Sequence, residues 1–207
     1  DHSSFNELYG KCHRHNVPIW LHPCRPQSYA DYDLYESEGK GSLHMIWNSF
    51  GWIYDTSVAM VHLAMSGVFR KYPGIKFISH HHGGMVPFFA ERFFTQLRNF
   101  EEKGRNDGSL NDLKYFYCDT ATFGVNSLNI QECLDFFSSG RVMFGTDTPM
   151  DMGNRGTFLK STLESVISCP AVVKDAKGEL LNDIMSGNAL KMLGERGPKL
   201  NNFKTSR

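Results

Sequence analysis

The regular alternation of short apolar runs with segments of helical periodicity constrains the fold of this chain more than any other feature. No two-residue turn typical of a β-hairpin joins one run to the next. Strands that alternate with helices predict parallel β-strands in right-handed crossover units, and therefore an α/β fold. The predicted strands are 17–22, 75–79, 114–118 and 141–145, and the helices predicted before them are 5–12, 52–68, 85–100 and 128–137.

Two segments fall outside this alternation. Residues 25–49 are polar and rich in Gly and Tyr, and connections longer than about 12 to 15 residues are usually lids or binding loops. We therefore expect a lid-like loop at 25–49. Only helical patterns follow Thr157, to about residue 195. With 207 residues, of which 41% are hydrophobic, the chain can bury a real core, so we expect a single α/β domain over 1–207.

Charge and cysteine usage limit the class of partner. The 22 Lys and Arg residues balance the 22 Asp and Glu residues without a basic cluster, so we expect a small-molecule ligand and neither nucleic acid nor a membrane. The five cysteines are scattered and form no C-x-x-C pair, which favours a reducing cytoplasm over a disulfide framework or a Cys-based zinc site. No apolar stretch approaches the roughly 18 residues of a membrane span, and residues 1–4 lack the features of a signal peptide, so we expect a soluble, unprocessed protein.

Each predicted strand ends on a polar side chain. The carboxyl ends of parallel strands meet at one edge of a sheet, where α/β enzymes bind their ligands. Imidazole nitrogens and carboxylate oxygens are the ligands that zinc and related divalent metals prefer. The convergence therefore favours a metal site with an open water position. The residues in question are His22, His81, Asp119-Thr120 and Asp147.

These residues also have plain structural interpretations. His22 can be a hydrogen-bonded structural residue, while Asp119 and Asp147 can stabilise turns. In the triplet His80-His81-His82, side chains of a strand alternate between its faces. We therefore expect His81 to face away from its neighbours, and one or two of the three histidines to take no part in a site.

Six motifs, in order along the chain, resemble the amidohydrolase-related decarboxylases, nearest to the aminocarboxymuconate-semialdehyde decarboxylase type. The resorcylate and carboxyvanillate decarboxylases follow closely, and the resemblance covers nearly the whole chain. The motifs are Leu21-His22-Pro23, Ser66-Gly67-Val68-Phe69 with Lys71-Tyr72-Pro73, His81-His82-Gly83-Gly84-Met85-Val86-Pro87-Phe88, Tyr117-Cys118-Asp119-Thr120-Ala121, Phe144-Gly145-Thr146-Asp147-Thr148-Pro149 and Gly187-Asn188-Ala189-Leu190.

The resemblance implies a metal-dependent TIM (β/α)8 barrel, of which this chain supplies the C-terminal half, strands five to eight. By position, His22 and Asp147 match metal ligands, and Asp147 counts among the catalytic residues as well. His81 matches the acid/base histidine, because Pro87 follows it by six residues as in the family. Arg92 matches an arginine that binds substrate carboxylate, in some relatives across a dimer interface; its plain alternative is a solvated helix arginine.

The chain also departs from the family pattern. The family's first strand carries an H-x-H or E-x-H pair of metal ligands, and its first four strands have no counterpart here. The motif His13-Arg14-His15 lies at the end of a predicted helix, where residues two apart point in different directions, so we do not expect it to bind metal. His82 stands where relatives often have Gly or Met. Either the sequence is a fragment, or the missing strands come from elsewhere, or the metal has been lost; a half-barrel alone should associate into a dimer or larger homo-oligomer.

Together these inferences predict a metal-dependent enzyme that decarboxylates an aromatic or unsaturated carboxylic acid without oxidation. The expected cofactor is a divalent metal, Zn²⁺ with Mn²⁺ as the alternative; His81 transfers a proton and Arg92 binds the carboxylate. A metal-dependent hydrolase of a lactone, amide or ester is the first alternative, because the wider superfamily uses the same apparatus. A non-catalytic fragment or assembly module is the second, supported by the missing ligand pair.

Overall fold

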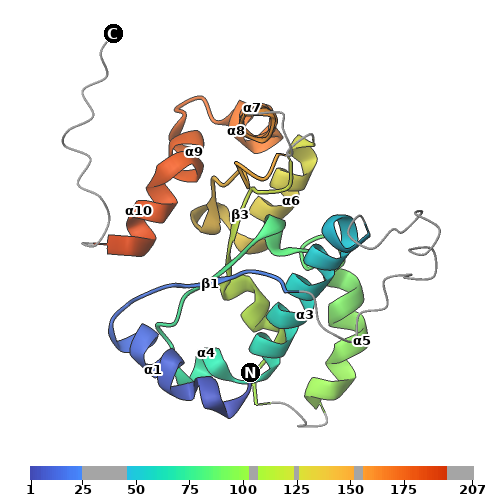
Figure 1. Cartoon of the computed structure of the whole chain (residues 1–207), viewed down its shortest axis with the longest axis vertical. Helices are drawn as coiled ribbons and strands as arrows, with labels where there is room; N and C mark the ends of the chain where they lie inside the picture. Colours follow the sequence, from blue (N-terminus) through green and yellow to red (C-terminus); the bar gives the residue numbers. More distant parts are fainter. Residues whose placement is uncertain (25–45, 103–106, 124–125, 152–155, 195–207) are drawn as a thin grey trace, which may run out of the picture.

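The computed structural model describes residues 1–24, 46–102, 107–123, 126–151 and 156–194, in which four short strands form one sheet (Figure 1). The strands lie side by side in the order β1-β2-β3-β4, and every pairing is parallel. The α/β fold with parallel strands is therefore confirmed. The strands are β1 (Ile19–Leu21), β2 (Phe77–Ser79), β3 (Tyr117–Asp119) and β4 (Val142–Met143).

Helices precede each strand and also follow the last one. α1 (Asn6–Arg14) precedes β1, and between the strands lie α3 (Trp52–Met65), α4 (Val68–Lys71), α5 (Ala90–Glu102) and α6 (Ser127–Phe137). After β4 come α7 (Thr157–Ile167), α8 (Pro170–Lys174), α9 (Glu179–Asn182) and α10 (Asn188–Leu193), with a π-helical turn at Asp183–Gly187. All of these elements after residue 157 are helical.

Local structure departs from the sequence pattern in two places. A π-helical turn at Trp47–Gly51 leads into α3, so the last residues of the predicted lid 25–49 are helical, and residues 25–45 lie outside the described part. The predicted strand 114–118 begins later, at Tyr117, because a 3-10 turn occupies Leu110–Tyr115. Ser109 and Asp112 form a capping box that satisfies the first amide groups of that turn.

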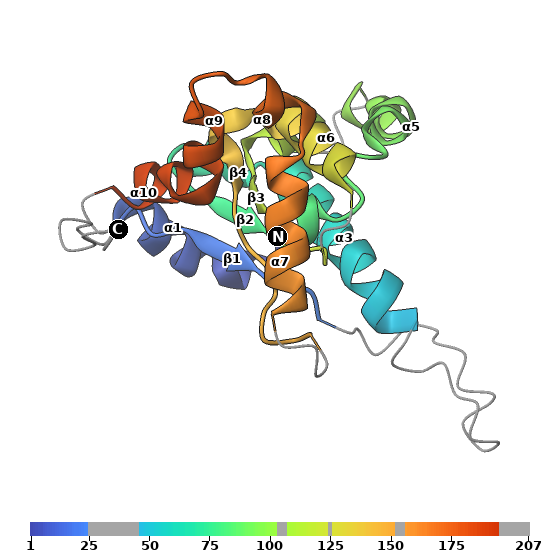
Figure 2. The same cartoon turned by 90° about the horizontal axis from the view of Figure 1, so that it is seen from above.

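The main hydrophobic core lies between the sheet and its outer helices (Figure 2). Phe77, Cys118 and Val142 come from neighbouring strands and are fully buried. They join Met60 of α3 and Ile130 of α6 in one cluster. Every second residue of the strands faces this core, so the intervening residues face the opposite side of the sheet.

That opposite face of the sheet is only partly covered. Ile78 and Met143 pack there with Met192 of α10 in a second, smaller cluster. Trp20 pairs in register with Ile78 and so shares this face, yet it is 59% exposed. Within the described residues, β1 pairs only with β2 and β4 only with β3, so the sheet is open at both edges.

Asn188 holds the motif Gly187-Asn188-Ala189-Leu190 beside the sheet, although more than 40 residues separate it from β4. Its side-chain amide donates hydrogen bonds of 2.7 and 2.8 Å to the backbone carbonyls of Ser139 and Val142. Asn188 is 1% exposed, so these bonds anchor α10 against β4 in a buried position. Among the described helices, none combines the length and apolar character needed to cross a bilayer.

Candidate active site

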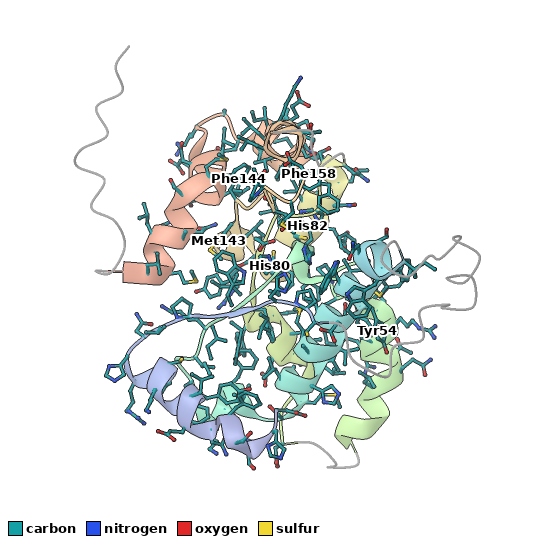
Figure 3. All side chains as sticks on the ribbon, in the orientation of Figure 1. Tyr54, His80, His82, Met143, Phe144 and Phe158 are labelled. Atoms are coloured by element: carbon teal, nitrogen blue, oxygen red, sulfur yellow. The ribbon has the colours of Figure 1, made fainter. Side chains whose placement is uncertain are left out.

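Three histidine rings gather at the carboxyl ends of β1 and β2. The ring of His22, which follows β1, lies 5.3 Å from that of His80 and 6.4 Å from that of His81, centroid to centroid. The rings of His80 and His81 are 5.3 Å apart. His80 and His82 lie near the centre of the molecule (Figure 3). The parallel sheet brings these groups together although more than 50 residues separate His22 from His80.

His22 is exposed and is oriented by its own backbone. Its Nδ1 lies 2.7 Å from the carbonyl oxygen of Pro23, and a carbonyl only accepts, so Nδ1 carries the proton and donates it. Its other ring nitrogen, Nε2, has no hydrogen bond to any described residue and can bind a metal ion. Trp52 of α3 packs against the ring at 5.5 Å. His22 therefore has the tautomer of a metal ligand.

The His80-His81-His82 segment does not follow strand alternation. β2 ends at Ser79, and His81–Gly83 form a 3-10 turn in which His81 and His82 have φ angles of +57° and +58°. The expectation that His81 faces away from both neighbours is wrong for His80, because its ring lies against that of His81. The left-handed conformation costs about 1 to 2 kcal/mol for each non-glycine residue, so the surroundings must hold this turn in place.

Two glycines complete the turn. Gly83 and Gly84 also have positive φ angles, +76° and +63°. A Cβ atom on Gly84 would lie 2.5 Å from the carbonyl oxygen of Ile53 and 2.6 Å from Oγ of Ser57. The same hydroxyl accepts the amide of Met85 at 2.7 Å. The turn is thus closely packed against α3, and no larger residue fits at Gly84.

Gly84→Ala is expected to lower the free energy of unfolding by about 3 kcal/mol, because the methyl group must displace a backbone carbonyl and adopt a positive φ. Chemical denaturation measures the change. Gly140→Ala is the matched control, since a Cβ at Gly140 meets nothing within 4 Å. Equal stability of the two variants would contradict the tight packing of the turn.

His82 belongs to the core. It is 2% exposed, and burial lowers its pKa to about 4. Its Nδ1 lies 3.2 Å from Oγ1 of Thr122, and Sγ of Cys133 donates to its carbonyl oxygen at 3.4 Å. His82 is thus the neutral, structural member of the triplet.

The pKa of His82 predicts a loss of stability in acid. Because the folded-state pKa of about 4 lies below the ordinary value of 6.5, the unfolded chain binds the proton first as the pH falls. The loss of unfolding free energy caused by His82 is absent above about pH 6.5 and reaches about 3 kcal/mol near pH 4. His82→Asn, which tolerates the positive φ, is expected to flatten the pH dependence of unfolding between these values. Parallel profiles for the two proteins would disprove this assignment.

Asp119 links the two strand ends at the centre of the site. The residue is 2% exposed, and its Oδ1 accepts hydrogen bonds from the backbone amides of His81 and Ala121 at 3.0 and 3.1 Å. Its Oδ2 lies 2.6 Å from Nδ1 of His80. The sequence predicts Asp119 as one of the strand-end residues, with a turn residue as the alternative, and predicts no role for His80. The available signal was the position of Asp119 at a strand end, which it shares with His22.

The pKa values of the two neighbouring histidines are shifted in opposite directions, because burial outweighs the nearby carboxylates only at His81. Burial by itself lowers the pKa of His80, but the hydrogen bond and charge of Asp119, together with the charge of Asp147, raise it above its usual value. Burial lowers the pKa of His81, and the charges of Asp119 and Asp147 offset this only in part. Nδ1 of His81 is buried and has no hydrogen-bond partner among the described residues. His81 is therefore a neutral imidazole with an unused nitrogen.

Asp147 follows β4 and is half-buried, with a φ of +61°. Its charge acts on both His80 and His81, so its carboxylate belongs to the same group. Within the described ranges, no three His, Cys, Asp or Glu side chains are arranged to hold a metal ion. The donor atoms of His22 and Asp147 suit a divalent metal but provide only part of a ligand set.

Arg92 and the H-x-H motif lie apart from these contacts. Arg92 is exposed on α5 and takes part in none of the interactions described above. Nδ1 of His13 accepts the amide of Gly74 at 3.2 Å. His13 and His15 lie before β1, at the amino end of the sheet, whereas the site lies at the carboxyl ends.

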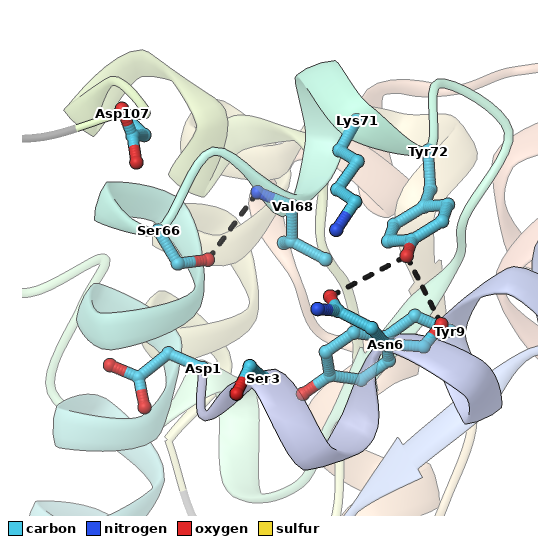
Figure 4. Close-up of a pocket in the computed structure, with 9 residues that line it drawn as sticks. All are labelled: Asp1, Ser3, Asn6, Tyr9, Ser66, Val68, Lys71, Tyr72 and Asp107. Carbon is cyan, nitrogen blue, oxygen red and sulfur yellow. Dashed lines mark hydrogen bonds between the residues drawn. The ribbon is translucent and has the colours of Figure 1, made fainter.

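A pocket of about 220 Å³ lies where α1 meets the α3–α4 connection (Figure 4). Tyr72 donates a hydrogen bond of 3.1 Å to the carbonyl oxygen of Asn6 there. None of the strand-end residues lines this pocket. Its lining residues are Asp1, Ser3, Asn6, Tyr9, Ser66, Val68, Lys71, Tyr72 and Asp107.

Comparison with known proteins identifies relatives along most of the chain. The 6-methylsalicylic acid decarboxylase of Penicillium expansum is 27% identical over 150 residues, which cover 72% of this chain and 43% of that protein. The 2-amino-3-carboxymuconate-6-semialdehyde decarboxylase of Dictyostelium discoideum is 23% identical over 203 residues, or 94% of this chain and 49% of that protein. The chain thus spans about half the length of the curated relatives it matches.

Solved structures share the fold. A 5-carboxyvanillate decarboxylase from Novosphingobium aromaticivorans, complexed with manganese and 4-hydroxy-3-methoxy-5-nitrobenzoic acid, has a TM-score of 0.71 and 18% identity, covering 92% of this chain and 51% of its own. A 2,6-dihydroxybenzoate decarboxylase from Rhizobium has a TM-score of 0.69 and 20% identity, covering 92% of this chain and 55% of its own. Residues 1–194 match the amidohydrolase family model, and the chain therefore belongs to the amidohydrolase family.

Proposed function

We propose that this chain is one α/β domain that forms strands five to eight of a metal-dependent (β/α)8 barrel, and that the whole protein is a non-oxidative decarboxylase of an aromatic or unsaturated carboxylic acid. The observation that carries the proposal is the cluster of His22, His80, His81 and Asp119 at the carboxyl edge of the sheet. The named activities of the relatives support this choice of reaction. The two open sheet edges support the half-barrel.

In this proposal His22 and Asp147 are two of the ligands of a divalent metal, zinc or manganese. The Nε2 atom of His22, which has no hydrogen bond to a described residue, supports this role, as do two similar structures described with bound manganese. The metal, when bound, supplies Lewis-acid polarisation of substrate oxygens. The remaining ligands come from outside the described residues, because these residues hold no cluster of three suitable side chains.

His81 moves the proton in the proposed reaction. Carbon dioxide leaves with cleavage of the carbon–carbon bond, the electron pair stays on the ring or alkene carbon, and that carbon takes up a proton. The neutral His81 ring accepts a proton at its unpartnered nitrogen from water or from a substrate hydroxyl group and then donates it to that carbon, and its lowered pKa favours the donation. Arg92 binds a substrate carboxylate through its planar guanidinium.

The partially covered sheet face supports association with further copies of the protein. Trp20 is 59% exposed beside the strand-end site, and a large exposed aromatic on an open sheet favours coverage, by the remaining strands of the barrel or by a further copy. We therefore propose a homo-oligomer, a dimer or larger, that acts on a small carboxylate.

The direct test is CO₂ release by the full-length protein, supplied with zinc or manganese, from a panel of hydroxybenzoic and dienoic acids. We expect turnover of at least one acid, with equal amounts of CO₂ and decarboxylated product. Turnover of neutral lactones or esters with no CO₂ from any acid would instead establish the hydrolase alternative.

Arg92→Ala is expected to lower kcat/KM for a carboxylate substrate by about 10- to 100-fold, because a charge-assisted bidentate pair is lost. Steady-state kinetics measure the loss. Arg98→Ala is the matched control, since Arg98 is another exposed arginine of α5. Equal effects of the two substitutions on kcat/KM would show that Arg92 does not bind the substrate.

A further inference from the structure

We infer that Asp119 is a positioning residue that holds the His81 turn and the His80 ring in one arrangement at the carboxyl edge of the sheet, and that His80 belongs to the site. The inference rests on the proposed function insofar as His81 is the proton-transfer group. It adds two residues that make direct contact with each other, one at the end of β3 and one at the end of β2.

The backbone of His81 depends on Asp119. His81 and His82 both adopt positive φ angles, which isolated residues of these types avoid. The amide of His81 points to Oδ1 of Asp119 at 3.0 Å, in a position where water does not replace the bond because Asp119 is 2% exposed. A hydrogen bond to a charged acceptor is stronger than one to a neutral acceptor. Loss of this carboxylate leaves a buried amide without its acceptor at the start of the turn.

Asp119 is itself held in place by its surroundings. The amide of Ala121 donates to the same Oδ1 at 3.1 Å. A Cβ atom on Gly145 would lie 3.0 Å from Cβ of Asp119, so the backbone that follows β4 packs closely beside it. Oγ1 of Thr120 donates to the carbonyl of Gly145 at 2.8 Å and ties the ends of β3 and β4 together. The carboxylate therefore has a rigid support on two strands.

The ring of His80 is held between two partners. Trp20 of β1 stacks on it at 5.1 Å with an interplanar angle of 22°, while Oδ2 of Asp119 lies 2.6 Å from its Nδ1. The His22 ring meets it edge-on at 5.3 Å. His80 thus connects the fixed carboxylate of β3 to the His22 ring of β1. The alternative is that Asp119 only stabilises a turn, as Asp175 does through its bonds to the amides of Leu180 and Lys177.

The first experiment requires no catalytic activity. Imidazole ¹⁵N spectra are recorded for the protein and for its Asp119→Asn, Asp119→Ala and Asp175→Ala variants. We expect both Asp119 substitutions to shift the ring signals of His80 and His81, and Asp175→Ala to shift neither. Unchanged His81 signals in Asp119→Ala would overturn the inference.

The second experiment measures kinetics. Asp119→Ala is expected to lower kcat by about 100-fold with KM nearly unchanged, as misplacement of a reacting group does. Asp119→Asn retains an oxygen that accepts the His81 amide, so it should recover part of the lost rate. Because Asp119 and His80 act together, the double variant Asp119→Asn/His80→Gln should be no slower than the slower single variant. The inference would be contradicted by a double variant whose loss of kcat equals the product of the two single losses. A normal kcat in Asp119→Ala would contradict it as well.

The two experiments separate failure of the inference from failure of the proposed function. If the unsubstituted protein decarboxylates no acid, the proposed function fails, while the ring spectra still decide whether Asp119 positions His80 and His81. If the protein is active and the spectra of the Asp119 variants are unchanged, only the inference fails.

Discussion

His81→Asn is expected to lower kcat of the full-length protein by about 100- to 10,000-fold, the usual contribution of a general acid or base. Nδ1 of His81 is buried without a partner among the described residues, and its lowered pKa keeps the ring neutral near pH 7. Asparagine cannot exchange a proton in this range, yet it tolerates the φ of +57°. The measurement is the single-turnover rate of CO₂ release with a saturating substrate.

His82→Asn is the matched control for this substitution. His82 has a nearly identical φ of +58° in the same turn, but its ring lies in the core against Thr122. We expect this variant to keep kcat at pH 7 when rates are normalised to the folded fraction. A similar loss in both variants would show that the turn, and not the His81 ring, limits the rate.

Loss of His22 or Asp147 is expected to remove the metal. His22→Ala deletes an imidazole whose Nε2 has no partner among the described residues, and Asp147→Asn replaces an anionic oxygen by a neutral amide at a φ that asparagine adopts readily. We expect each substitution to weaken metal binding by at least about 100-fold, since even changes outside the ligand shell cost 10- to 100-fold. Metal content after dialysis, measured by mass spectrometry, and titration of the apo-protein report the change.

His15→Ala controls for histidine loss in general. His15 lies at the end of α1, before β1, and so at the far end of the sheet from the strand-end cluster. We expect this variant to retain the metal content and the activity of the unsubstituted protein. Full metal content in a His22→Ala/Asp147→Asn double variant would eliminate both residues as ligands.

The fold was predictable to a large extent because its signals are local. The apolar runs near Ile19, Phe77, Tyr117 and Val142 are all strands, and their parallel pairing follows from the helices between them. Strand ends were less predictable. β3 begins after a 3-10 turn whose capping box competes with extended structure, and a pattern of apolar residues does not distinguish the two conformations.

The candidate site was predictable only in outline. His22, His81 and Asp147 were expected at strand ends, and the structure places all three there. The sequence predicts no role for His80 and leaves Asp119 between a site residue and a turn residue, because the importance of both depends on a contact between two strands that neither segment encodes by itself. The alternation rule failed at His81 because the strand ends two residues earlier, at Ser79.

The amino-acid sequence by itself determined the α/β class, the order of strands and helices, and the residue types at the strand ends. These follow from periodicity and from side-chain chemistry, which are properties of neighbouring residues. Only the tertiary structure decided which histidines share a site. The register of β2 against β3 places the carboxylate of Asp119 next to the ring of His80 and the amide of His81. In the turn with positive φ angles that follows, the side chain of His82 lies in the core. Such contacts arise from packing between distant segments, so they exist only once the sheet has formed.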